Sequence, residues 1–145
     1  IRDNRMPIKT YSVEDISISV FNRNIRGLAD SRVKIAMSED AFTYTPDTDG
    51  NGTRNKNPNQ SGTIVITLKA SSDDNLFLSG LAAADYQTKL GTFPVLVKDN
   101  NGTSLYTAAE AWIQKIADAE FSKEVGDREY TIMCHKLIMV NGGNF

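Results

Sequence analysis

Residues 59–75 constrain the fold of this chain more than any other stretch. Their centre, residues 63–68, is the densest β-branched run in the sequence, which predicts a strand. Because successive side chains of a strand point to opposite faces, Ile64, Ile66 and Leu68 share one face, and we predict that they belong to the core. Residues 71–74 (Ser-Ser-Asp-Asp) follow as a helix-start signal, since a Ser hydroxyl accepts a free backbone N–H and carboxylates favour the positive end of the helix dipole.

One helix is predicted, at about residues 73–89. Leu76 or Phe77, then Leu81, then Ala84 recur at helical spacing and give an apolar stripe, so Leu81 is assigned to the core. Gly91 follows the stripe, and we expect it to end the helix.

Period-two alternation predicts strands along most of the remaining chain. These strands are expected at residues 15–21, 25–28, 32–37, 42–45, 93–98, 105–107, 110–116 and 128–140. We therefore predict a mainly β protein, a small barrel or sandwich of about eight antiparallel strands with one flanking helix.

The length of 145 residues fits one domain with one core. We place this domain at residues 11–140, with an N-terminal arm at 1–10 and a C-terminal tail at 141–145. Residues 1–5 are charged and patternless, and we expect them to be a cloning remnant that precedes the natural start at Met6.

Residues 47–60 differ from the rest because they contain no large apolar side chain. They hold Gly50, Gly52 and Pro58, and we predict a long polar loop that is mobile unless a partner orders it. Long loops in compact domains are often functional, so this loop is a candidate contact element. Residues 47–52 also match the opening of a calcium loop, but Pro58 stands where the twelfth ligand should be. We therefore interpret this stretch as a polar turn and assign no metal.

Charge and composition exclude several classes of protein. The net charge is −2; residues 1–72 carry ten Lys and Arg against eight Asp and Glu, and residues 73–145 carry six against ten. Neither half of the chain has the large excess of Lys and Arg that is typical of a DNA-binding domain. No apolar run is long enough to span a bilayer. The single cysteine, Cys134, excludes an internal disulfide.

The residues that most often do chemistry do not form a catalytic pattern. Cys134 and His135 are neighbours in a predicted strand, so their side chains point to opposite faces and cannot form a nucleophile–base pair. A solvated connection before the last strand is the preferred interpretation of the acidic cluster Asp118, Glu120, Glu124, Asp127 and Glu129. No phosphate-cradling glycine loop is present. We predict that the chain is not an enzyme and that it binds no cofactor.

Seven stretches in order give the chain a family resemblance that covers nearly all of residues 11–139. They are residues 11–20 (Tyr-Ser-Val-Glu-Asp-Ile-Ser-Ile-Ser-Val), 38–42, 59–68, 71–75, 93–99 (Phe-Pro-Val-Leu-Val-Lys-Asp), 109–113 and 124–129. In this order they resemble the tail tube proteins of contractile-tailed bacteriophages and prophages, which are similar in fold to the haemolysin-coregulated tube proteins of type VI secretion.

This resemblance implies a structural role in the virion. Such subunits form hexameric rings, and the rings stack into a tube whose lumen carries DNA into the host without binding it specifically. The implied partners are further copies of the chain and the sheath, baseplate and tail terminator proteins, with no membrane. Assembly would take place in the cytoplasm of the bacterial host. The alternatives are a type VI secretion tube protein and a β-sandwich module that binds a ligand through residues 47–60.

Two sets of contact residues are predicted within this interpretation. The inter-ring candidates lie in the predicted loop and are Asp47, Asp49, Asn51, Arg54, Lys56, Asn57, Asn59 and Gln60. The lumen-facing candidates have small polar side chains and are Ser17, Ser19, Thr43 and Thr45. Arg54 and Lys56 are expected to meet acidic residues such as Asp118, Glu120 or Glu124 of the next ring.

Overall fold

The computed structural model describes residues 8–144, so the predicted cloning remnant at residues 1–5 lies outside the described part. The described chain contains ten strands, one α-helix and one 3-10 helix. Their bounds are η1 Val13–Asp15, β1 Ile16–Val20, β2 Arg23–Asn24, β3 Leu28–Met37, β4 Phe42–Pro46, β5 Gly52–Lys56, β6 Gly62–Lys69, α1 Asp74–Thr88, β7 Phe93–Asp99, β8 Leu105–Lys115, β9 Asp127–Cys134 and β10 Ile138–Val140.

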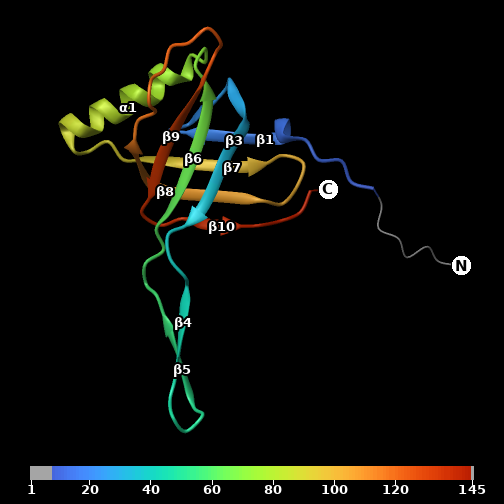
Figure 1. Cartoon of the computed structure of the whole chain (residues 1–145), viewed down its shortest axis with the longest axis vertical. Helices are drawn as coiled ribbons and strands as arrows, with labels where there is room; N and C mark the ends of the chain where they lie inside the picture. Colours follow the sequence, from blue (N-terminus) through green and yellow to red (C-terminus); the bar gives the residue numbers. More distant parts are fainter. Residues whose placement is uncertain (1–7, 145) are drawn as a thin grey trace, which may run out of the picture.

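Eight of these strands form one antiparallel sheet that curls on itself. The strand order is β2-β1-β7-β8-β9-β6-β3, and β10 pairs with β8. The sheet curls so far that β3 crosses in front of β7 in Figure 1, and apolar side chains from both halves fill the space between them. The predicted mainly β architecture with one flanking helix is confirmed.

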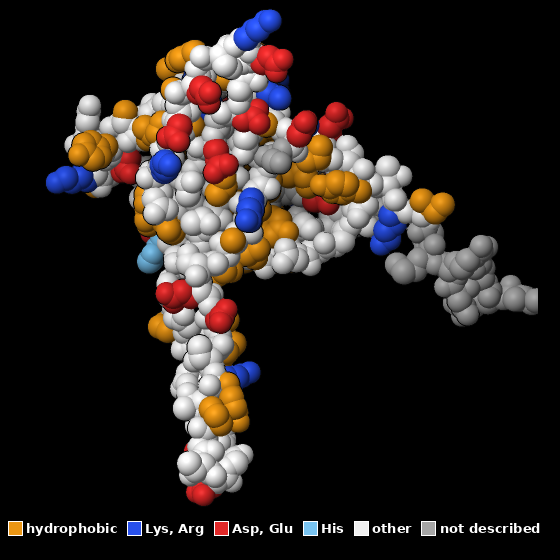
Figure 2. All heavy atoms as spheres, in the orientation of Figure 1, with side chains coloured by type: hydrophobic (Ala, Val, Ile, Leu, Met, Phe, Trp, Pro, Cys, Tyr) orange, Lys and Arg blue, Asp and Glu red, His pale blue; other side chains and the backbone are white. Residues whose placement is uncertain are grey.

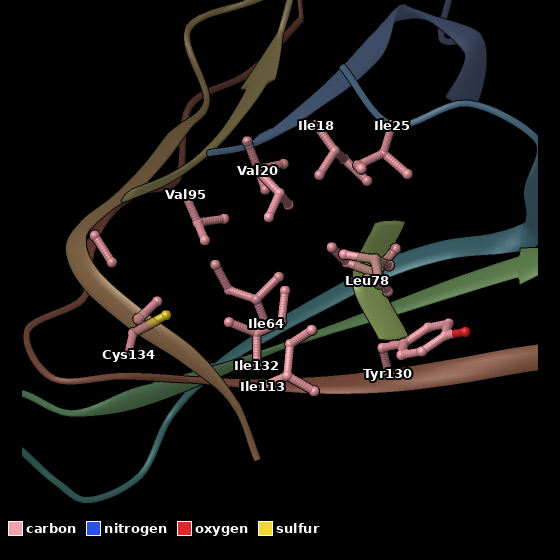
Figure 3. Close-up of a cluster of buried hydrophobic side chains, with 14 of the residues drawn as sticks. Ile18, Val20, Ile25, Ile64, Leu78, Val95, Ile113, Tyr130, Ile132 and Cys134 are labelled. Carbon is pink, nitrogen blue, oxygen red and sulfur yellow. The ribbon is translucent and has the colours of Figure 1, made fainter. Parts of the chain in front are cut away.

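The core is built from the inward faces of the central strands. On β6, Ile64, Ile66 and Leu68 are fully buried, and Leu81 of the helix is partly buried and packs against the core cluster that contains them. Figure 3 shows Ile64 and Ile132 pointing into the same apolar cluster as Ile18 and Val20. Burial of these side chains is the main favourable term in the folding of the body.

The helix covers one end of the curled sheet. It begins at Asp74, close to the predicted start, and Lys89 ends it in the left-handed conformation with φ +63°. Of the expected stripe, Phe77 and Leu81 pack against the core, whereas Leu76 and Ala84 are exposed. Leu78, which the stripe omitted, is fully buried, and Lys89 rather than Gly91 is the capping residue. The helix docks through the face that carries Leu78, and docking rather than spacing decides which apolar residues are covered.

Three predicted strand boundaries are also corrected. Phe21 and Asn22 both have positive φ and form a two-residue turn, so the return strand begins at Arg23 instead of Ile25, and Ile25 is a core residue. Residues 105–107 and 110–116 belong to one continuous strand, β8. The strand expected over 128–140 is interrupted at residues 135–137, and both of its parts, β9 and β10, pair with β8.

The expected loop over residues 47–60 is for the most part a β-hairpin. β4 and β5 pair from Phe42 with Lys56 to Pro46 with Gly52, and this hairpin extends away from the body (Figure 1). We call residues 42–56 the projecting hairpin. Residues 52–56 pair through their backbone although they carry no large apolar side chain, because β4 supplies the matching edge and the aromatic cross-strand partners.

Candidate assembly surfaces

The projecting hairpin places its side chains in solvent rather than in a core. All ten residues of β4 and β5 are exposed, and Phe42 and Tyr44 remain 45% and 66% exposed. The Arg54 guanidinium lies over the Phe42 ring at 4.2 Å from its centroid. A two-stranded hairpin without a packed face is only marginally stable in water, so this element is suited to contact with a partner.

The turn at the tip of the projecting hairpin is organised by a single carboxylate. The backbone N–H groups of Asp49 and Asn51 donate to Asp47 Oδ1 at 2.9 and 3.0 Å. Gly50 has φ +86°, a conformation that other residues adopt only with strain. The residues that prompted the calcium interpretation therefore form an Asx-type turn.

Amide and carboxylate side chains tie the base of the projecting hairpin together. Asn57 Nδ2 donates to Glu39 Oε2 at 2.6 Å, and the N–H of Asn57 donates to the Ala41 carbonyl at 2.8 Å. The hydrogen bond from Asn57, followed by one from Asn59, holds the pKa of the Glu39 carboxyl below its usual value. Beside this link lies an apolar groove of about 480 Å³, whose walls include Met37, Phe42, Leu137 and Ile138.

The inter-ring candidates lie on one element. Asp47, Asp49 and Asn51 belong to the tip, Arg54 and Lys56 to β5, and Asn57, Asn59 and Gln60 to the base. The lumen-facing candidates are not brought together, because Ser17 and Ser19 belong to β1 of the main sheet whereas Thr43 and Thr45 belong to β4.

The outward face of β1, β7, β8 and β10 is a surface that the sequence reasoning missed. One row across these strands is Ser19, Leu96, Thr107 and Ile138, and the next is Ser17, Lys98, Leu105 and Val140. The four apolar members of these rows are between 37% and 52% exposed. An apolar outward face on an antiparallel sheet indicates a contact surface. In the sequence, this face is indicated by Leu96, an apolar residue between Val95 and Val97, which are buried. An uninterrupted apolar run of this kind is equally typical of a core strand.

The connection from β8 to β9 forms a second exposed surface at the end of the body away from the projecting hairpin. β6 begins at the base of the projecting hairpin and ends at Lys69, which pairs with Asp127 at the start of β9. Phe121 and Val125 in this connection are 88% and 63% exposed. Figure 2 shows acidic side chains gathered at this end, where Asp118, Glu120 and Glu124 lie.

Cys134 and His135 are neighbours in the sequence, but their side chains lie in different environments. Cys134 is fully buried, and burial raises the pKa of its thiol to about 11, so it is held in the thiol form. His135 is exposed and lies just after the end of β9, so the expectation that both residues belong to one strand is wrong, although their side chains still lie in different environments. Residues 8–144 contain no cluster of His, Cys, Asp and Glu suited to a metal ion. No helix within that range has the length and apolar character needed to cross a bilayer.

A family model described as bacteriophage PhiTE tail tube protein matches residues 8–142. The chain therefore belongs to this family of phage tail tube proteins, which are structural components of the virion. Structural protein ORF10 of Pseudomonas phage KPP10 is 30% identical over an alignment of 145 positions that includes 93% of this chain and 83% of that protein.

Solved structures share the fold at low sequence identity. A chain of the PVC sheath–tube complex of an extracellular contractile injection system superposes with a TM-score of 0.65 at 17% identity, covering 90% of this chain and 91% of that one. The anti-feeding prophage tube-terminating cap gives a TM-score of 0.62 at 9% identity, covering 95% of each chain. These likenesses show that chains of a sheath–tube complex and of a tube-terminating cap share the curled sheet with one helix.

Proposed function

We propose that this chain is a tail tube subunit whose copies close into hexameric rings, that the rings stack into a tube inside a contractile sheath, and that DNA passes through its lumen during genome delivery. The observation that carries this proposal is the projecting hairpin, which extends from the body with every strand residue exposed. Such an element contributes little to the stability of its own subunit, and a neighbouring copy gives it a function.

Contacts within a ring use the free edges of the main sheet. The outer edge of β3 pairs with no other strand among residues 8–144, and it is ten residues long. A long free edge favours pairing with another chain, and a closed ring removes the hazard of uncontrolled aggregation. The apolar parts of the outward rows, from Leu96 to Ile138 and from Leu105 to Val140, provide a further area for a neighbour, whereas Ser17 and Ser19 lie at the β1 end of these rows.

Contacts between rings use opposite ends of the subunit. The projecting hairpin of one subunit reaches the β8–β9 connection of the next, and Arg54 and Lys56 meet Asp118, Glu120 or Glu124. We propose that this contact stabilises the projecting hairpin, which is marginal in the free subunit. Asp47, Asp49, Asn51, Asn57, Asn59 and Gln60 take part as its tip and base.

The lumen is proposed to be small-polar and without a basic field, so that DNA does not bind to its wall. Thr43 and Thr45 of the projecting hairpin and Ser17 and Ser19 of β1 remain the lumen-facing candidates. Because they lie on different sheets, one continuous wall requires the projecting hairpin of one ring to lie beside the body of another.

The partners outside the tube are proposed to be the sheath, the baseplate and a terminator, with assembly in the host cytoplasm. The solved chains with this fold come from a sheath–tube complex and a tube-terminating cap, which supports the first and last of these partners.

Negative-stain microscopy of the concentrated protein tests the proposed function. Rings or tubes with a central hole are expected, whereas a uniformly monomeric preparation at every concentration would count against the proposal. A variant in which a two-residue Asn-Gly turn replaces residues 45–53 is expected to fold and to form no tubes. Unchanged tubes from this variant would show that the stacking assignment is wrong.

A further inference from the structure

The structure carries a second charged surface at the end of the body away from the projecting hairpin, and we propose that it receives the tip of the projecting hairpin of the next copy. We call this surface the arginine hollow and define it by Arg23, Arg26 and Arg128. The inference rests on the proposed stacking and adds a specific contact to it: the Asp49 carboxylate at the tip binds the guanidinium groups of the hollow.

The position of the arginine hollow follows from the strand register. Leu28 at the start of β3 pairs with Leu68 near the end of β6, and the N–H of Lys69 donates to the Gly27 carbonyl. The other ends of the same two strands, Met37 and Gly62, lie at the base of the projecting hairpin. The hollow and the hairpin are therefore separated by the length of β6, roughly 25 Å at about 3.3 Å per residue. Opposite ends are what a head-to-tail contact between identical subunits requires.

The arginine hollow consists of two adjoining depressions that share Arg23. One, of about 640 Å³, is lined by Arg23 and Arg26, and the other, of about 760 Å³, by Arg23 and Arg128. Both are also lined by Asp73 and by residues of the turn between β6 and α1.

The Asp74 carboxylate beside Arg23 and Arg26 is already engaged. Asp74, which is 5% exposed, accepts hydrogen bonds from Arg23 Nε at 2.8 Å and from the N–H of Arg26 at 2.6 Å. The guanidinium of Arg26 forms no ion pair with any described residue. Arg128 Nε is buried without a hydrogen-bond partner in the described chain, and its guanidinium lies 5.6 Å from the centroid of the Phe121 ring. Two arginines thus retain donors for an acidic ligand.

The tip of the projecting hairpin carries the matching charge. Residues 35–53 contain no Lys or Arg, and the turn itself holds Asp47 and Asp49. Asp47 Oδ1 is used by the turn, whereas the Asp49 side chain is exposed and accepts no hydrogen bond from the described residues. A carboxylate on a narrow, protruding turn fits a guanidinium in a depression, and charge-assisted pairs of this kind fix orientation as well as affinity.

A second copy is favoured over a nucleic acid as the occupant. The β8–β9 connection beside the arginine hollow carries Asp118, Glu120 and Glu124. These carboxylates repel a continuous polyanion, whereas the projecting hairpin presents acidic residues at its tip and Arg54 and Lys56 behind it. The acidic tip can thus meet the arginine hollow while Arg54 and Lys56 meet the acidic β8–β9 connection.

Charge-swap variants test the contact through tube assembly. D49R and R26D are each expected to raise the critical concentration for tube formation at least about tenfold, which corresponds to one charge-pair contact per junction. The double variant D49R/R26D restores the pair with reversed sign and is expected to return within about threefold of the original chain. The matched control is D49R/K89E, whose second change lies at the exposed end of the helix and is expected to give no rescue. Unimpaired assembly of D49R, or equal rescue by both double variants, would overturn the inference while leaving the tube function in place.

Disulfide trapping tests the same contact without requiring complete tubes. The variant D49C/R26C is expected to form a ladder of linked subunits under mild oxidation, whereas D49C/K89C is expected to form much less. The native Cys134 does not compete because it is buried. Equal ladders in the two variants, or none in either, would count against the arginine hollow as the receptor. If the original chain forms no tubes but D49C/R26C still gives the ladder, the contact stands and the tube function is what fails.

Discussion

The body and the projecting hairpin use the same alternation of side chains for opposite purposes. On β6 every second residue is fully or nearly fully buried, and the alternation separates core from surface. On β4 the alternating Phe42, Thr43, Tyr44 and Thr45 are all exposed, because β5 is the only strand within residues 8–144 that pairs with it. Alternation therefore determines which residues share a face, but it does not determine whether that face meets a core, solvent or another subunit.

This difference separates the sources of stability in the two regions. Burial of an apolar side chain contributes about 1.5–3 kcal/mol in the body. A cross-strand pair in the projecting hairpin contributes about 0.2–1 kcal/mol. We expect the two regions to respond independently to substitution, with the body governing folding and the hairpin governing assembly.

The largest expected effect comes from truncation of the core. Ile66→Ala removes a fully buried side chain and is expected to lower the free energy of unfolding by about 3–4 kcal/mol. The matched change in the projecting hairpin, Phe42→Ala, is expected to cost less than about 1 kcal/mol. Urea unfolding followed by circular dichroism measures both values. Similar losses for the two variants would show that the hairpin and the body form one cooperative unit.

A smaller effect on the stability of the body is expected from the buried Cys134 thiol at high pH. Burial raises the pKa of the Cys134 thiol to about 11, whereas an unfolded thiol titrates near about 8.5. Its contribution is therefore complete below about pH 8.5 and is lost as the pH rises through the folded value, a loss of about 3 kcal/mol by about pH 11. Cys134→Ala is expected to remove this part of the pH dependence, which urea unfolding between pH 8 and 11 measures. Identical slopes in the two proteins would contradict the assignment.

The parts of the fold that could be predicted from sequence are those specified by residues close together along the chain. The strand over 63–68 and the helix that follows it were predicted because apolar periodicity and helix-start residues lie within the same short stretch. β5 was missed because Gly-Thr-Arg-Asn-Lys has no apolar periodicity, and its pairing depends on the backbone and aromatic residues of β4. The buried face of the helix was predicted only in part: Phe77 and Leu81 were named and do pack against the core, but Leu78 was not, because spacing alone does not show how the helix docks.

The same distinction applies to the candidate site. The projecting hairpin residues were named from sequence because they are contiguous and polar. The arginine hollow was not, because Arg23, Arg26 and Arg128 come together only through the pairing of β3 with β6 and of β6 with β9. The spacing of residues along the sequence does not show which distant segments come into contact.

A still smaller effect is expected where the body anchors its helix. The Tyr130 hydroxyl donates to Asn75 Oδ1 at 2.9 Å, and both residues are buried. Tyr130→Phe keeps the ring but leaves the Asn75 acceptor without this partner, so a loss of about 1–2 kcal/mol is expected. Thermal unfolding measures it, and tube assembly of the folded variant is expected to be unchanged. A loss of assembly at unchanged stability would instead link the helix anchor to the subunit contacts.

The smallest expected effect defines how weakly the projecting hairpin is held in the free subunit. Arg54→Ala removes the guanidinium that lies 4.2 Å from the Phe42 ring centroid, a contact worth about 0.5–1 kcal/mol at an exposed site. Because the hairpin is marginal by itself, we expect amide exchange across β4 and β5 to become a few-fold faster while exchange in β6 stays the same. Arg54→Lys keeps the charge but not the planar stacking and is the matched control; it should accelerate exchange less. If Arg54→Ala leaves exchange in the hairpin unchanged, the stacking contact does not hold β4 and β5 together, and their order depends on backbone pairing alone.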